Sequence, residues 1–100
     1  MTVKVLVLKS SEKLICDLEE VDDGNQYRMQ YPRKVPSINY IQRTNTLNVS
    51  YESWCNLSYE EDILIPKDWV VCVLDPHPEL VVNYEEAIAS IEQDLAIKNS

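Results

Sequence analysis

The feature that most constrains this chain is a run of short apolar segments that alternate with turn residues and have no helical period between them. Their alternating apolar and polar positions, rich in Val, Ile and Tyr, are typical of half-buried strands. These segments are 3–9, 13–21, 26–31, 47–54 and 62–74. Strands that follow one another without helical crossovers exclude a parallel sheet. Because a small open sheet leaves exposed edges, we predict a strongly bent, five-stranded antiparallel barrel.

The only glycine marks the sharpest reversal of the chain. Gly24 lies in "DDGN" at 22–25, beside Asp and Asn residues that tolerate positive backbone dihedrals. The turn should lead into a third strand at 26–31, where period-2 alternation gives three residues a common face. These residues are Tyr27, Met29 and Tyr31.

Two prolines interrupt the pattern after this strand. Pro32 and Pro36 lack the N–H that a strand ladder needs, so we predict a loop or irregular edge over 32–46, with a short extended piece at "INYI".

The hydrophobic period changes once, after "DPHP". From there the apolar residues recur every three or four positions, which places them on one face of a helix over 78–97. They are Leu80, Tyr84, Ile88, Ile91 and Leu95. A chain of 100 residues suits one core. We therefore predict a single domain over 1–100, with the barrel at 3–75 and a C-terminal helix.

Two segments resemble the signature of a known superfamily. "VKVLVLKSSEKLICDLEEVDDGN" is similar to the Sm1 pattern, and "ILIPKDWVVCV" is similar to Sm2. Over 3–75 the chain thus resembles the Sm, LSm and Hfq proteins, and in its overall style the small Sm-like proteins of marine cyanophage type. Three features depart from that pattern: Asp22 and Asn25 stand one residue closer together, Pro66 and Lys67 replace an Arg-Gly pair, and the helix comes last.

The resemblance implies a cyclic homo-oligomer that binds single-stranded nucleic acid, with RNA as the expected ligand and DNA as the alternative, and a role in RNA or DNA processing. We expect neighbouring subunits to pair through "DILI" at 62–65 and "QYRMQY" at 26–31. Around the opening of such a ring, Asn25, Arg28 and Lys67 of each subunit would converge.

The charge distribution has one anomaly. Residues 26–51 contain no acid, although the whole chain has 17 acids and a formal net charge of -8. Cations that neutralise phosphates, together with tyrosines that stack on unpaired bases, are typical of single-strand binding. The alternative is that these tyrosines are ordinary core residues and that the cations pair with the many acids. The predicted contact set is Asn25, Tyr27, Arg28, Arg33, Lys34, Tyr40, Arg43 and Lys67.

A second functional class stays open, because a strongly acidic subunit repels phosphate. The same barrel could be a protein-interaction or assembly module that binds no nucleic acid. We expect no enzyme, no cofactor and no metal site, because the sequence has no Gly-rich phosphate loop, nucleophile elbow or zinc-ligand spacing. No apolar stretch is long enough to cross a membrane, so a cytoplasmic location is expected, in the host cytoplasm if a phage encodes the chain.

Overall fold

The computed structural model describes the backbone of residues 1–98 and the side chains of residues 1–93. It is mainly β, with one C-terminal helix, as the sequence predicted. In chain order the elements are β1 (Val3–Leu8), β2 (Lys13–Val21), η1 (Asp22–Gly24), β3 (Gln26–Ile41), β4 (Thr46–Ser53), β5 (Asp62–Pro66), η2 (Lys67–Trp69), β6 (Val70–Leu74) and α1 (Pro78–Lys98).

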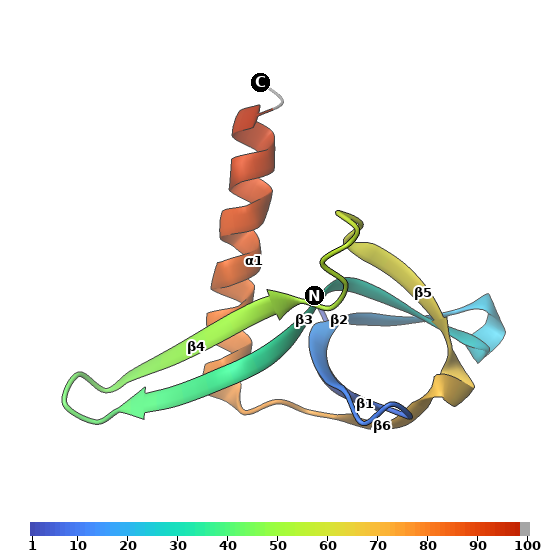
Figure 1. The fold of residues 1–100 in the computed structure, drawn as a ribbon, viewed down its shortest axis with the longest axis horizontal. Helices are drawn as coiled ribbons and strands as arrows, with labels where there is room; N and C mark the ends of the chain where they lie inside the picture. The colour runs from blue at the N-terminus through green and yellow to red at the C-terminus, as the bar shows by residue number, and fades with distance from the viewer. Residues whose placement is uncertain (99–100) are drawn as a thin grey trace.

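The strands form one curled antiparallel sheet in the order β4-β3-β2-β1-β6, and β5 also pairs with β3 (Figure 1). The prediction of a closed five-stranded barrel was only partly right: there are six strands, and in the described chain β5 and β6 do not pair with each other. The reason lies in their connection. β5 ends at Pro66, which has no N–H, and the short turn η2 sends the chain on to pair with β1.

β3 is a single strand of 16 residues, so only 42–45 of the predicted loop is a turn, whereas the irregular ladder around the prolines and the extended piece at "INYI" are as predicted. Both prolines lie where the ladder is irregular. The β2–β3 register shifts between the pairs formed by Gln30 and Arg33, and the β3–β4 register shifts between Lys34 and Ser37. At such bulges residues are left unpaired, so a missing proline N–H costs no ladder bond.

The first bulge also corrects the predicted face of Tyr31. This residue has a φ of 53°, in the left-handed region, and its side chain packs in the cluster beneath α1 instead of joining Tyr27 and Met29. A bulge inserts one residue and so shifts the alternation of faces by one position.

The central part of the sheet, formed by β1, β2 and the first half of β3, is covered on both faces, each by its own apolar cluster. Alternation along β2 places Leu14 and Cys16 in the cluster inside the curl, while Ile15 points the other way toward α1. The predicted helical face is confirmed where side chains are described, because Tyr84 and Ile88 are fully buried. Two further members, Leu80 and Ile91, pack beside them, and Leu95 lies outside the described side chains.

Tyrosine hydroxyls fasten α1 to the sheet. The Tyr84 hydroxyl donates to the carbonyl oxygen of Tyr31 at 2.7 Å, and the Tyr51 hydroxyl donates to Asn83 Oδ1 at 2.6 Å. The two rings meet edge to face with centroids 6.0 Å apart. These contacts hold the first half of α1 against the sheet, at the point where β3 leaves the sheet body.

Beyond Pro36 the chain leaves the sheet body as a two-stranded arm, which we define as residues 36–50 (Figure 1). β2 pairs with β3 only as far as Arg33, so the arm has β4 on one side and no strand on the other. An isolated hairpin of this kind is marginally stable in water. The arm therefore depends on what packs against its faces.

Candidate interaction surfaces

The predicted contact set divides among three places in the fold. Asn25, Tyr27, Arg28 and Lys67 lie near the turns η1 and η2, Arg33 and Lys34 lie at the base of the arm, and Tyr40 and Arg43 lie on the arm. The set is thus dispersed along the sheet instead of forming one continuous basic surface.

The turn group brings together residues some 40 positions apart in sequence. The Lys67 N–H donates to the Asn25 carbonyl oxygen at 3.1 Å, and Lys67 Nζ lies 5.5 Å from the centroid of the Tyr27 ring. Asn25 and Lys67, with Gly24 and Asp68, line an open hollow of about 480 Å³. Gly24 has a φ of 85°, which only glycine adopts without strain, and so shapes this rim.

The charge in this hollow is partly neutralised. Lys67 Nζ donates to Glu20 Oε1 at 3.0 Å, and this hydrogen bond is the main cause of the raised pKa of Lys67. Tyr27 is 7% exposed and belongs to the core inside the curl, so its ring face is not free for stacking. What the hollow offers a ligand is the Lys67 ammonium and the Asn25 amide.

Arg28 lies on the other side of β3 and is bound by acids from both neighbouring strands. Its Nε donates to both carboxylate oxygens of Asp62, at 2.8 and 3.0 Å, and its Nη1 lies 3.9 Å from Glu19 Oε2. These hydrogen bonds lower the pKa of Asp62 and raise that of Arg28.

Arg33 is buried at the base of the arm and is not a surface cation. Its guanidinium makes a two-pronged contact with the Glu61 carboxylate, one prong at 2.9 Å, and donates to the Pro32 carbonyl oxygen at 3.0 Å. The side chain of Arg33 is 10% exposed and that of Glu61 30% exposed. This geometry is that of a structural ion pair.

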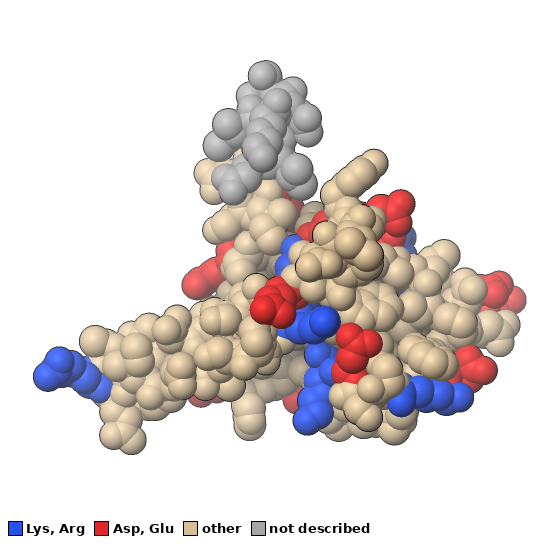
Figure 2. Space-filling model, in the orientation of Figure 1, with Lys and Arg blue, Asp and Glu red and all other residues tan. Residues whose placement is uncertain are grey.

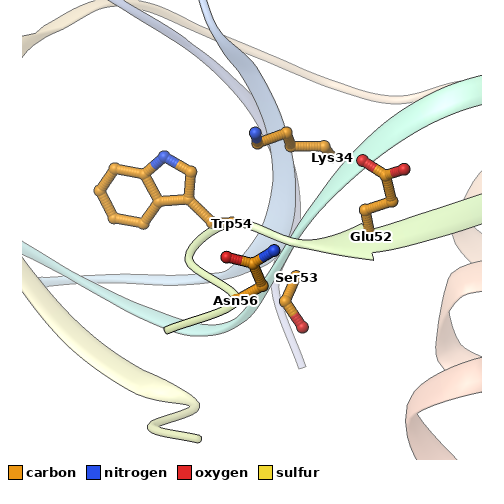
Figure 3. Close-up of a pocket in the computed structure, with 5 residues that line it drawn as sticks. All are labelled: Lys34, Glu52, Ser53, Trp54 and Asn56. Carbon is orange, nitrogen blue, oxygen red and sulfur yellow. The ribbon is translucent and has the colours of Figure 1, made fainter. Parts of the chain in front are cut away.

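Lys34 lies beside a polar pocket of about 360 Å³, lined also by Glu52, Ser53, Trp54 and Asn56 (Figure 3). In Figure 3 its ammonium is directed toward the side of Trp54, and Glu52 lies at the opposite end. Both Lys34 Nζ, at 3.8 Å, and Trp54 Nε1, at 3.2 Å, approach Glu12 Oε2. The local carboxylates thus compete with any anion that enters this pocket.

The arm has an apolar face and a polar face. Cross-strand pairing puts Ile38 opposite Val49 and Tyr40 opposite Leu47 on one face, while the other carries polar pairs such as Asn39 and Asn48. Ile38 and Tyr40 are still 50% and 56% exposed. In Figure 2 the arm is tan except for the blue at its free end, where the sequence has Arg43.

Of the five predicted contact cations, four have a carboxylate within ion-pair distance, and within the described side chains only Arg43 has none. The alternative interpretation, in which the cations pair with nearby acids, therefore holds for four of them. These are Arg28, Arg33, Lys34 and Lys67. A phosphate that approached these four would have to compete with a carboxylate already in place.

The sequence interpretation missed the most exposed apolar element, which is β6. All five of its residues are apolar, and four of them are exposed, Val71 to 63% and Leu74 to 50%. Among the strands that the structure describes, β6 pairs only with β1, so its outer edge is open to the described chain. The expected pairing edge at 26–31 was wrong, because that segment of β3 lies between β2 and β5. The unbroken run "VVCVL" predicts a strand but not its exposure, so the sequence carries no signal for this surface.

No three His, Cys, Asp or Glu side chains of the described residues gather as a metal site would require. None of the helices described combines the length and the hydropathy needed to cross a bilayer.

Comparison with known proteins places the chain in one family. A family model described as a family of unknown function (DUF6561) matches residues 1–89, so the chain belongs to that family. No curated protein matches it.

Proposed function

For this member of DUF6561 we propose an assembly function: the chain is an Sm-like module that associates with further copies of itself into a closed ring. The observation that carries the proposal is the open edge of β6, an entirely apolar strand with four exposed residues. A flat apolar edge of this kind promotes uncontrolled pairing unless another strand covers it.

β5 is the strand best suited to cover that edge. Within residues 1–98 it pairs only with β3, which leaves its outer edge open as well, and its residue Leu64 is 56% exposed. β5 and β6 have five residues each. Every strand pair in the sheet is antiparallel, so we propose antiparallel pairing of β5 in one subunit with β6 in the next.

Such a contact joins two different surfaces, and repetition of it by rotation closes a ring. The curl of the sheet supports the Sm-like part of the proposal. β5 and β6 lie at its two ends, joined by η2, so pairing across subunits would complete a barrel that each chain leaves open.

The test is a matched pair of charge insertions on exposed valines, followed by light scattering coupled to size exclusion. Val71→Lys, on β6, should convert the oligomer to monomer, because an edge lysine blocks strand pairing. Val82→Lys, on α1, should keep the parent mass, since Val82 is exposed to a similar degree, 57%. A parent chain that is monomeric at micromolar concentration would overturn the proposal, as would an unchanged mass for Val71→Lys.

A second candidate function is binding of single-stranded nucleic acid, favoured by the convergence of Asn25 and Lys67 on one open hollow. In a ring this hollow would recur once in each subunit, so several weak contacts would add together. The surrounding acids, among them Glu20, make each contact weak.

Fluorescence anisotropy with short unpaired RNA and DNA, at two salt concentrations, tests this candidate. Lys67→Ser should lower affinity and reduce the slope of log affinity against log salt by about 0.7 for each subunit in contact. Lys4→Ser is the control, because Lys4 also holds a single ion pair, with Asp75. Equal binding by the Lys67 variant and the parent, or no binding by the parent at low salt, would exclude the hollow.

A further inference from the structure

The connection from β4 to β5 carries the most exposed apolar side chains that the structure describes. Leu57 is 93% exposed and Tyr59 is 95% exposed, and the connection rises from the sheet body (Figure 1). We name residues 55–60 the hook. Large apolar side chains left this bare are a feature of segments that dock elsewhere.

The same chain has an apolar cleft between the arm and the start of α1. Two hollows of about 240 Å³ each share Ile38 and Leu80 in their walls. The inner hollow is lined further by Val5, Lys13 and Val35, and the outer one by Tyr40, Leu47, His77 and Glu79. We name these two hollows together the cleft.

The charges of hook and cleft are complementary. Glu60 ends the hook, and Lys13 lies in the wall of the inner hollow. Among the described side chains neither of them has an oppositely charged group within ion-pair distance. The hook thus offers two apolar side chains and a carboxylate. The inner hollow offers apolar walls and an ammonium, while the outer hollow also has the carboxylate of Glu79 in its wall.

The chain connections would bring hook and cleft together in the proposed ring. If β5 pairs antiparallel with the β6 of a neighbour, the residue that begins β5, Asp62, lies near the residue that ends β6, Leu74. Tyr59 precedes Asp62 by three residues, and His77 follows Leu74 by three. Three residues of chain span at most about 10 Å, so the connections allow the hook to reach the neighbour's cleft in such a ring.

We propose that the hook of each subunit docks in the cleft of the next subunit, with Leu57 and Tyr59 against Ile38 and Leu80, and Glu60 beside Lys13. This inference rests on the proposed ring and names a second contact within it. The contact would also stabilise the arm, because the docked hook covers the exposed apolar face that the two-stranded arm cannot bury alone.

The first test is dilution of the full chain followed by mass measurement, with Leu57→Ser/Tyr59→Ser as the hook variant. If each side chain contributes about 1.5 kcal/mol by burial, the concentration at which the oligomer dissociates should rise by about 100-fold. Val82→Ser is the control and should dissociate as the parent does, because Val82 is equally an exposed apolar residue but lies on α1.

The second test exchanges the two charges. Glu60→Lys alone and Lys13→Glu alone should each raise the dissociation concentration by about 2- to 5-fold, as exposed ion pairs do, and the double exchange should restore it. All these residues are at the surface, so circular dichroism should give the parent spectrum for every variant.

The outcomes separate this inference from the proposed ring. If the parent assembles, Val71→Lys is monomeric and the hook variant dissociates as the parent does, then the ring stands and the hook inference is wrong. Single charge variants that behave as the parent would overturn the pairing of Glu60 with Lys13. A parent that is monomeric at every concentration removes both the ring and the hook contact.

Discussion

Replacing Arg33 separates the two interpretations of the basic segment most sharply. As a nucleic-acid contact, Arg33 could be removed with loss of binding and no loss of stability. As the buried partner of Glu61, its removal should destabilise the fold. The structure favours the second result for Arg33→Met, because the side chain is 10% exposed and its guanidinium is bonded to the Glu61 carboxylate and the Pro32 carbonyl.

The expected magnitude follows from the exposure of the two partners. Removal of one member of a buried ion pair costs about 3–5 kcal/mol, chiefly because the other charge is left without a partner. Glu61 keeps 30% of its side-chain surface in solvent. We therefore expect Arg33→Met to lower the free energy of unfolding by about 2–3 kcal/mol, equivalent to about 10–20 °C in Tm for a domain of this size.

The assay is denaturant unfolding followed by tryptophan fluorescence, at one fixed protein concentration because self-association would shift the midpoint. Lys34→Met is the control and should cost less than about 1 kcal/mol, since Lys34 lies 3.8 Å from Glu12 and is partly exposed. Arg33→Met/Glu61→Leu should recover more than half of the loss. Parent-like stability of Arg33→Met, with weaker nucleic-acid binding, would refute the reasoning.

Three further predictions concern the same fold. Tyr84→Phe should cost about 1–2 kcal/mol in thermal unfolding, because the Tyr31 carbonyl loses its hydrogen bond. Burial raises the pKa of Cys16 to about 12 from 9.0, so the folded state holds this proton more tightly and stability should fall as pH rises from about 9, by at most about 1.4 kcal/mol per pH unit. Denaturant unfolding at pH 8 and pH 10 should show this fall, and Cys16→Ala should reduce it. Gly24→Ala should cost about 1 kcal/mol in the same assay, from its positive φ alone, because the added Cβ would meet only Glu20 Oε2, at 3.9 Å.

The sequence predicted those parts of the fold that depend on hydrophobic periodicity and on turn residues. The alternation in β2 predicts that Leu14 and Cys16 lie on one face and Ile15 on the other. The spacing of Tyr84 and Ile88 likewise predicts the buried face of α1, because both patterns depend only on neighbours along the chain. Whether the strand continues through Pro32 and Pro36 could not be predicted from such local patterns. Whether a proline interrupts a strand depends on whether the ladder needs its N–H, which the partner strand decides.

The candidate site shows the same division between features that depend on sequence neighbours and features that depend on residues far away in the chain. Residue type and spacing do not reveal that Arg33 is buried, because its partner Glu61 comes from 28 positions away in sequence. The exposure of β6 was equally hidden, since "VVCVL" reads as a strand covered on both sides until the sheet order leaves its outer edge open. The contact of Asn25 with Lys67 was expected only from the Sm-like resemblance.

The sheet order gives a physical reason for the acid-free segment. The first half of β3 lies between β2 and β5, and these neighbours supply Glu19 and Asp62 to Arg28. Opposite charges on adjacent strands stabilise a sheet, so charge that is balanced across strands is segregated along the sequence. Residues 36–50, from the end of β3 through most of β4, form the arm, whose only charge is Arg43. An arm with one apolar face and a single charge at its tip suits burial against a neighbour better than attraction of a phosphate chain. The segment therefore supports assembly more directly than nucleic-acid binding, and Lys67 is left as the cation on which the binding proposal depends.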